Sequence, residues 1–194
     1  MGDHEVRVSI THCGVYHTDI QAIDNYYGIT TFPFVPGHEI VGTVVEIGSA
    51  VVMVPYGGFS TSVVADYRFV YLLPPSMPSS PAAVLMCAGI TVYTALKKYA
   101  AYPGLQTGIL DVGGLGHLPI QFAHALGCEV TAISSSPAKR EQAYAFGADH
   151  FVDANDSANM GKLEYRLDLM LCTANGGINW GPVMNTMKKR GQFI

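Results

Sequence analysis

Residues 108–194 alternate short apolar runs with helical patterns, and this alternation limits the fold more than any other feature of the chain. The apolar runs are GILDV (108–112), EVTAIS (129–134), HFVD (150–153) and LDLMLC (167–172). Helical stretches HLPIQFAHALG and PAKREQAYAFGA separate them, and after a loop we expect a further helix that ends at KKRGQFI. Such a β-α-β-α-β series implies a parallel sheet covered by helices. This half of the chain is therefore predicted to be α/β.

The first 80 residues have a different sequence pattern, typical of β-strands. Residues 5–10 alternate like a half-buried strand, while residues 40–47 and 61–73 are rich in β-branched and aromatic side chains, with Gly, Pro and Ser between them. The segment PPSMPSSP (74–81) is a turn-rich connector, and residues 82–100 form a long apolar helical stretch. We predict a β-rich domain over residues 1–80 and an α/β domain over residues 81–194.

Charge and cysteine usage exclude several classes of function. The net charge is −4 with 13% charged residues and no block of like charge, so there is no electrostatic footprint for nucleic acid or an anionic membrane. We find no run of ~18 apolar residues and no basic region at the N-terminus, which makes the cytoplasm the expected location. The four cysteines form no C-x-x-C pair, which argues against a disulfide scaffold or a zinc ribbon.

A glycine turn follows the first apolar run of the α/β half. The segment ILDVGGLGH places Gly113, Gly114, Leu115 and Gly116 between a strand and a helix. In a dinucleotide-binding βαβ unit such glycines let the backbone approach a pyrophosphate at the helix N-terminus. Asp111 occupies the place of the first glycine of that pattern, where a carboxylate could disturb the turn or repel phosphate. A tight turn without a ligand is the alternative interpretation.

The end of the next strand indicates which dinucleotide would bind. NAD-binding proteins carry an acidic residue for the ribose diol about 20 residues after the glycine turn. This chain instead has hydroxyl and cationic side chains, which suit a 2′-phosphate: Ser134, Ser135, Ser136, Lys139 and Arg140. The simpler interpretation is a solvated helix N-terminus with Ser136 as N-cap and Pro137 at the first helical position, and both interpretations can hold together. We predict NADP.

The stretch ITHCGVYHTDI (10–20) crowds a cysteine, two histidines and an aspartate together. With VPGHEIVGTVVEIG, MCAGITVY, GGLGH and ISSSPAKREQA, its segment CGVYHTDI resembles the zinc-dependent medium-chain alcohol dehydrogenases, most closely the cinnamyl-alcohol-dehydrogenase-like branch that uses NADP. The resemblance covers nearly the whole chain in the same order. It implies a GroES-like β-rich catalytic domain joined to a Rossmann domain, and reversible oxidation of an alcohol to an aldehyde.

The same resemblance implies a catalytic zinc. Two of the family's ligand positions fall on His38 and Cys87, with Glu39 beside them to complete the shell, whereas the first falls on Tyr16. A tyrosine must lose a proton with a pKa near ~10 before it becomes a comparable ligand. Cys13 is the alternative ligand, but an odd offset along an extended segment points to the opposite face. His38 as a turn histidine and Cys87 as a small core residue are the structural alternatives.

Neighbouring positions carry further roles implied by the family. His17 matches a position near the cofactor phosphates, and Thr18 matches the hydroxyl that passes the alcohol proton outward. Asp19 matches a carboxylate that orients the ligand histidine, because a metal-bound imidazole needs its second nitrogen held. Gln21 stands where the family has a histidine, and an amide cannot relay a proton as an acid or base.

Two of the family's segments are expected to be missing. Between VEIGSAVV and PYGGFSTSVV the family carries a lobe with four cysteines for a structural zinc, so we predict no structural zinc. The chain stops at GQFI, which resembles the fifth Rossmann strand, so both domains are expected to be incomplete. A truncated chain and a degenerate paralogue both fit this pattern.

The sequence thus predicts an NADP-linked alcohol or aldehyde oxidoreductase. Zinc on His38 and Cys87 would act as a Lewis acid, and Thr18 would accept the substrate proton. The expected partner is a small-molecule alcohol or aldehyde, without nucleic acid or membrane, and a homodimer is an open option. The alternatives are a catalytically impaired nucleotide-binding remnant, suggested by Tyr16, Gln21 and Asp111, and a zinc-free reductase of the quinone-reductase type, which the retained GHE and CAGIT motifs disfavour.

Overall fold

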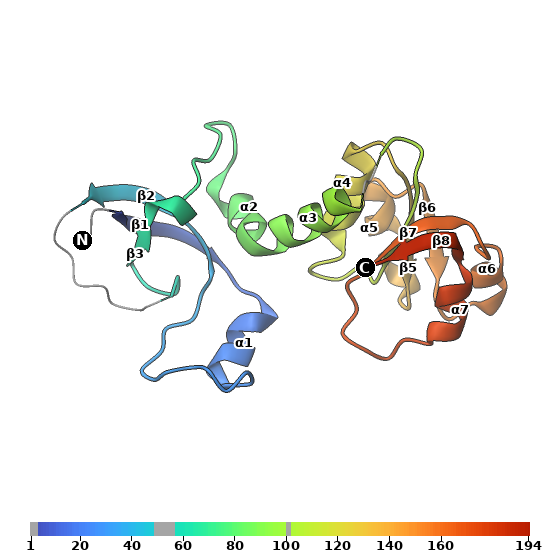
Figure 1. Ribbon diagram of the computed structural model, residues 1–194, viewed down its shortest axis with the longest axis horizontal. Helices are drawn as coiled ribbons and strands as arrows, with labels where there is room; N and C mark the ends of the chain where they lie inside the picture. Colours follow the sequence, from blue (N-terminus) through green and yellow to red (C-terminus); the bar gives the residue numbers. More distant parts are fainter. Residues whose placement is uncertain (1–3, 49–56, 100–101) are drawn as a thin grey trace. The chain divides into compact units, whose positions relative to one another are not determined.

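A computed structural model describes residues 4–48, 57–99 and 102–194 of the chain (Figure 1). The chain divides into two compact units, Met1–Gly89 and Ile90–Ile194. This division lies later than the predicted boundary at residue 80, because the first part of the long apolar helix packs on the strands of the first unit.

The first unit is built on a three-stranded antiparallel sheet with the order β2-β1-β3. Its strands are β1 (Glu5–Gly14), β2 (Glu39–Ile47) and β3 (Ser62–Asp66). Alternation in β1 buries Val6 and Val8, as expected for a strand with one covered face. Val41 packs with Ala82 and Ala83 of helix α2 (Ser79–Val84) to form a small core. The predicted β-rich character of this half is confirmed.

In this unit one predicted strand is shorter than expected, and one helix was not predicted. The strand expected over 61–73 ends at Asp66, where a 3₁₀ turn, η1 (Tyr67–Phe69), begins and the Asp66 side chain accepts a hydrogen bond from Arg68 N at 2.9 Å. A short helix, α1 (His17–Ile23), follows β1 and begins after Tyr16. In both places a local side-chain-to-backbone bond at an aspartate outweighs the β propensity of the neighbouring residues.

The long apolar helix runs from Ser79 to Lys98. It consists of α2, a π-helical turn η2 (Leu85–Gly89) and α3 (Ile90–Lys98). Contrary to the expectation from composition, this helix is long and apolar enough to cross a membrane, with a mean hydropathy of 1.4 over its most apolar window. A core helix of a globular protein passes the same test, so length and composition alone are weak evidence for a membrane span.

The second unit contains a five-stranded parallel sheet with the order β6-β5-β4-β7-β8. Its strands are β4 (Gln106–Leu110), β5 (Glu129–Ser134), β6 (His150–Asp153), β7 (Leu167–Cys172) and β8 (Met187–Phe193). The middle strands are almost continuously buried, as in sheets that helices cover on both faces. The predicted α/β fold is confirmed, and the strand order reverses between β4 and β7.

The helices of this unit include α4 (His117–Ala125), α5 (Arg140–Ala145), α6 (Ser157–Gly161) and α7 (Trp180–Asn185). Helix α6 was not predicted, although Asp156 caps it by accepting hydrogen bonds from two backbone N–H groups. The last helix ends at Asn185 and not at KKRGQFI, because Met187–Phe193 pair with β7 as a strand. The following residues form β8, which confirms the first three residues of GQFI as part of the fifth strand.

Candidate metal and nucleotide sites

The turn after β4 forms without its first glycine. Asp111 adopts a φ of 74°, a left-handed conformation that glycine usually supplies and that aspartate tolerates better than most residues. Asp111 N donates to Ile133 O at 2.9 Å, and the Thr173 hydroxyl donates to Asp111 O at 3.0 Å. These two bonds hold the backbone in the sharp turn, so β4 ends at Leu110 and not at Val112 as predicted.

Two other glycines of the turn differ in what a side chain at their position would contact. A Cβ on Gly116 would lie 1.9 Å from Asp111 O, so only glycine lets the start of α4 pack against the end of β4. Gly114 is exposed, and a Cβ there would meet nothing within 4 Å, which leaves its backbone open to a ligand. Close packing is the role of the third glycine in dinucleotide-binding turns, and the open backbone at Gly114 suits the predicted phosphate contact.

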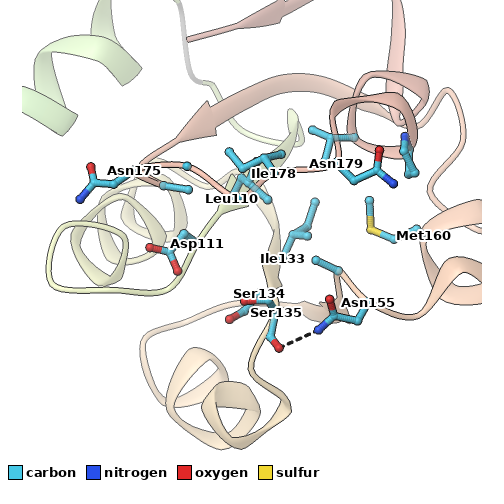
Figure 2. A pocket seen from close by; sticks show the side chains of 16 residues that line it. Leu110, Asp111, Ile133, Ser134, Ser135, Asn155, Met160, Asn175, Ile178 and Asn179 are labelled. Carbon is cyan, nitrogen blue, oxygen red and sulfur yellow. Dashed lines mark hydrogen bonds between the residues drawn. The ribbon is translucent and has the colours of Figure 1, made fainter.

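A cavity of about 510 Å³ lies at the carboxyl ends of the strands in this unit (Figure 2). Asp111, Ser134 and Ser135 line it, whereas Ser136, Lys139 and the turn from Gly113 to Gly116 do not. Ligands of open α/β sheets bind at this edge, at the point where the strand order reverses. Sequence reasoning missed the other polar side chains of the lining, which follow β6 and β7: Asn155, Asn175 and Asn179.

Several of the hydroxyl and cationic residues at the end of β5 and just after it form hydrogen bonds that fix where they lie. Ser134 is buried, with its hydroxyl oxygen accepting from Ser136 N at 3.2 Å, and the exposed Ser135 offers its carbonyl to Asn155 Nδ2 at 2.9 Å. Ser136 occupies the N-cap position before a 3₁₀ turn, η3 (Pro137–Lys139), without a side-chain capping bond. Lys139 Nζ donates to Val112 O and therefore lies beside the glycine turn. A lysine and two serines thus flank the place where a nucleotide phosphate would bind.

The first unit brings the three predicted metal residues together. The ligand atoms of His38, Glu39 and Cys87 all lie within 4.8 Å of one another. Glu39 is the first residue of β2 and His38 precedes it, whereas Cys87 lies in the π-helical turn η2. Turns of this kind inside α-helices occur frequently at functional sites.

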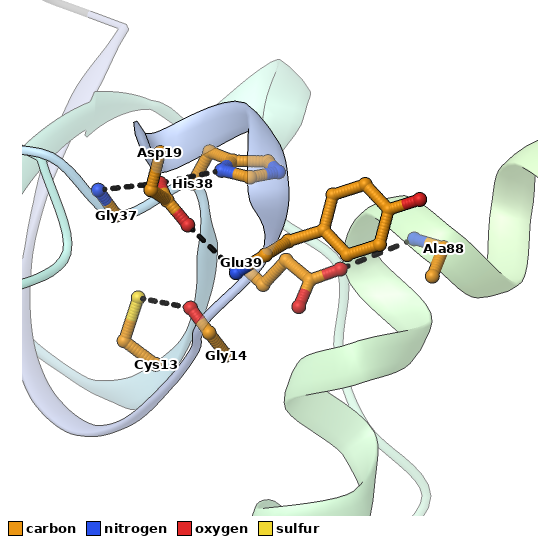
Figure 3. Close-up of polar contacts among 8 residues, drawn as sticks. Cys13, Gly14, Asp19, Gly37, His38, Glu39 and Ala88 are labelled. Carbon is orange, nitrogen blue, oxygen red and sulfur yellow. Dashed lines mark hydrogen bonds and ion pairs between the residues drawn. The ribbon is translucent and has the colours of Figure 1, made fainter. Parts of the chain in front are cut away.

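His38 is held by a buried carboxylate (Figure 3). Its Nδ1 lies 2.9 Å from Asp19 Oδ1, and the same aspartate accepts hydrogen bonds from Gly37 N and Tyr16 N. Burial alone would raise the Asp19 pKa, but the bonds from Tyr16, His38 and Gly37 outweigh it and hold the pKa below its ordinary value. The predicted Asp19–His38 contact is present, and it leaves Nε2 of the imidazole for a metal.

Glu39 is also held in place by its surroundings. It is 1% exposed, and its Oε1 accepts a hydrogen bond from Ala88 N at 3.2 Å. A Cβ on Gly14 would lie 2.0 Å from Glu39 Oε2, so a glycine at the end of β1 makes room for the carboxylate. Sequence reasoning did not single out Gly14, and its only signal was its place in CGVYH.

Tyr16 lies beside this group, whereas Cys13 does not join it. The Tyr16 and His38 rings are 6.5 Å apart between centroids, edge to face. Burial, followed by the charges of Cys87 and Glu39, raises the Tyr16 pKa above its ordinary value, so the phenol stays protonated at neutral pH. The Cys13 thiol lies 3.5 Å from Gly14 O, outside the group of three ligands (Figure 3), and burial raises its pKa.

The remaining predicted residues lie on helix α1. His17 is its exposed first residue, and Thr18 follows it, half-buried. Gln21 accepts a hydrogen bond from the Tyr27 hydroxyl at 2.8 Å. The roles of His17 at the cofactor phosphates and of Thr18 in proton transfer stay predictions.

The residues present in the first unit fit a zinc ion. An imidazole, a thiol and a carboxylate are the three ligand types that zinc takes from proteins, and catalytic zinc sites use three protein ligands. The second unit supplies a glycine turn and a cavity at the edge where nucleotides bind. A β-rich unit with such a ligand group and an α/β unit with such a turn fit a two-domain protein that uses a metal ion and a nucleotide cofactor.

Comparison with known proteins gives the family. Residues 2–61 match the alcohol dehydrogenase GroES-like domain, and residues 114–194 match the zinc-binding dehydrogenase domain. The whole chain is 34% identical to probable cinnamyl alcohol dehydrogenase 5 of Oryza sativa subsp. japonica, covering 68% of that protein. It is 32% identical to the aldehyde reductase AdhA of Synechocystis sp., again over its whole length and over 69% of the relative.

Solved structures agree with these matches. A cinnamyl alcohol dehydrogenase from Sorghum bicolor superposes with a TM-score of 0.90 at 33% identity, over 99% of this chain and 68% of that one. The quinone oxidoreductase from Thermus thermophilus gives a TM-score of 0.82 at 26% identity, over 98% and 64%. The chain belongs to the zinc-dependent medium-chain alcohol dehydrogenases, in the cinnamyl-alcohol-dehydrogenase-like branch. The predicted class of function, an alcohol or aldehyde oxidoreductase, is confirmed at the level of this family.

The chain spans about two thirds of the length of the curated relatives that it matches, from 66% to 71%. Several alignments extend over 240 positions, more than the 194 residues of this chain. The relatives therefore carry internal segments that this chain lacks, in agreement with the expected gap. Residues 49–56, where that gap was predicted, lie outside the described residues.

Proposed function

We propose that this protein is an NADP-linked alcohol or aldehyde oxidoreductase that holds one catalytic zinc on His38, Cys87 and Glu39. The observation that carries the proposal is the mutual approach of three different zinc-type ligands within 4.8 Å. Asp19 supports it, because a carboxylate at Nδ1 fixes the tautomer and the orientation that a metal-bound imidazole needs.

The chain's own residues would position the reacting groups. When bound, zinc would supply a Lewis acid for the substrate oxygen, and NADP would accept or return the hydride. Asp19 keeps the His38 ring in place, and the Thr18 hydroxyl is the proposed carrier of the alcohol proton. Gln21 has no titratable group, so the proposed path for this proton ends at Thr18.

Three features support NADP over NAD. The end of β5 carries Ser134 and Ser135 in place of an acidic residue, and Lys139 lies beside the glycine turn. The quinone oxidoreductase from Thermus thermophilus, which shares the fold at 26% identity, is described in complex with NADPH. A 2′-phosphate would find hydroxyl and ammonium donors at this position, and no carboxylate at the Ser134 position to repel it.

Tyr16 favours a second candidate function, a nucleotide-binding protein with little or no turnover. A phenol stands where the family has a thiolate, and with an ordinary pKa near ~10 it is a poorer zinc ligand than a thiol. A zinc-free reductase is the third candidate, and the group of His38, Glu39 and Cys87 argues against it.

Three further features stay predictions. We propose that the protein has no structural zinc, in keeping with a sequence of only four well-separated cysteines. A cytoplasmic location and a homodimer are likewise proposed from the sequence and the family.

Turnover by the zinc-loaded protein tests the proposed function. The chain should oxidise primary alcohols with NADP in preference to NAD, and Cys87→Ser should abolish this activity while leaving NADP binding unchanged. If alcohols and aldehydes across a broad panel give no turnover while NADP still binds, the second candidate replaces the first.

A further inference from the structure

Asp111 lines the nucleotide cavity, and its carboxylate has no partner among the described residues. Its backbone N–H and carbonyl are both hydrogen-bonded, so the left-handed turn is fixed. Its carboxylate has no hydrogen bond and no ion pair within residues 4–48, 57–99 and 102–194. Asp111 is nevertheless part of the cavity lining, as Figure 2 shows.

The position of the carboxylate is set by the turn itself. A Cβ built on Gly113 would lie 3.0 Å from Asp111 Oδ2, so the carboxylate stands over the glycine at which a pyrophosphate would approach the backbone. The nearby cation does not neutralise it, because Lys139 Nζ is directed to Val112 O and forms no ion pair with Asp111 in the part of the chain that the structure describes. A fixed negative charge therefore occupies the space next to the phosphate position.

We propose that Asp111 sets the affinity of this protein for its dinucleotide by repelling the pyrophosphate. The inference rests on the proposed function, because it assumes that the cavity takes NADP. Asp111 supplies the left-handed residue of the turn, but its carboxylate lowers the affinity for phosphate. Glycine would adopt the same backbone conformation without the charge. We therefore expect NADPH to bind more weakly than it would without this charge.

The test compares three variants of the full chain by titration with NADPH. Asp111→Asn keeps the size and the tolerance of a left-handed φ but removes the charge, and it should tighten the dissociation constant by about 10-fold or more. Asp111→Gly should tighten it at least as much. Asp24→Asn makes the same change in net charge at an exposed position of the other unit, and it should leave NADPH affinity unchanged.

Salt provides an independent readout, because screening weakens repulsion between charges. The advantage of Asp111→Asn over the parent protein should shrink as the ionic strength rises. Equal NADPH affinity of the parent, Asp111→Asn and Asp111→Gly would overturn the inference and leave the proposed function standing. If none of the three binds NADPH although all melt cooperatively, both the inference and the proposed cofactor are wrong.

Discussion

Tyr16 lies beside Cys87 and Glu39 in a position where the family places a thiolate ligand, and the structure explains why it is a poor replacement. Its phenol is partly buried and faces two acidic groups, which raise its pKa. The other nearby thiol, Cys13, faces Gly14 O and is not part of the group. The site therefore depends on three ligands, one of which is a carboxylate that also accepts a bond from Ala88 N.

Changing Tyr16 to Cys should restore a thiolate and raise zinc affinity by at least about 10-fold. Alcohol oxidation should rise with it in a zinc-limited assay. Competition with a chromophoric chelator measures the affinity, and Tyr16→Phe serves as the control because it removes the hydroxyl without adding a ligand. Unchanged zinc affinity in Tyr16→Cys would mean that the metal does not use this position.

We expect Ser134 to decide between the two dinucleotides. It is 2% exposed at the end of β5 and lines the cavity. Ser134→Asp should invert the preference from NADP to NAD, because a carboxylate would bond a ribose diol and repel a 2′-phosphate. Dissociation constants for NADPH and NADH measure this ratio. Tighter NADH than NADPH binding by the unchanged protein would show that the assignment of NADP is wrong.

At the scale of elements, the turn between β4 and α4 offers a matched pair of glycines. Gly116→Ala would place a methyl group 1.9 Å from Asp111 O, whereas Gly114→Ala would enter open space. The first change should destabilise the protein by about 2 kcal/mol or more and weaken NADPH binding. The second should cost little stability. Thermal melts and titrations of both variants check the pair, and equal stability losses would contradict the described turn.

The amino ends of three parallel strands are linked by one carboxylate. Glu129 begins β5, accepts from Gln106 Nε2 of β4 at 2.6 Å, and lies 3.0 Å from His150 Nε2 of β6. The hydrogen bond from Gln106, followed by that of His150, holds the Glu129 pKa below its ordinary value. A depressed carboxyl pKa stabilises the fold above the unfolded-state value, and this stabilisation is lost as the pH falls through the folded-state pKa.

Glu129→Gln should therefore lower stability at pH 7 by up to about 1 kcal/mol, a modest effect because the side chain is 45% exposed. The deficit should shrink as the pH falls below about 4.5, the ordinary value for this carboxyl. Chemical denaturation across this range measures it, with Glu141→Gln on the surface of α5 as the charge control. A deficit that persists or grows at low pH would show that the linkage is wrongly described.

Long apolar runs were the most predictable elements. β5, β6 and β7 match the predicted strands residue for residue, because buried parallel strands read as continuous apolar segments. Three of the errors concern where an element ends: a 3₁₀ turn follows β3 at Asp66, strand β8 follows α7 after Thr186, and the turn at Asp111 shortens β4. The order of the motifs along the chain predicted the metal group. Gly14 and the asparagines of the cavity were not predicted, because their roles depend on contacts between residues far apart in the sequence.

At the scale of the whole molecule, each unit contains one of the two sites expected for the family. The first unit assembles three ligands within itself, and the second forms a glycine turn and a cavity within itself. The chain spans about two thirds of its relatives, yet both family domains match it.

The zinc content of the purified chain tests the central claim most directly. Protein prepared without chelators and supplied with zinc should bind about one equivalent per chain, and Cys87→Ser should lose most of it because thiolate is the strongest of the three ligands. Elemental analysis after dialysis gives both numbers, and Cys172→Ser, which changes a thiol of the second unit, should retain the metal. If the unchanged protein keeps no zinc, or if Cys87→Ser keeps as much as Cys172→Ser, the group of His38, Glu39 and Cys87 is not a zinc site.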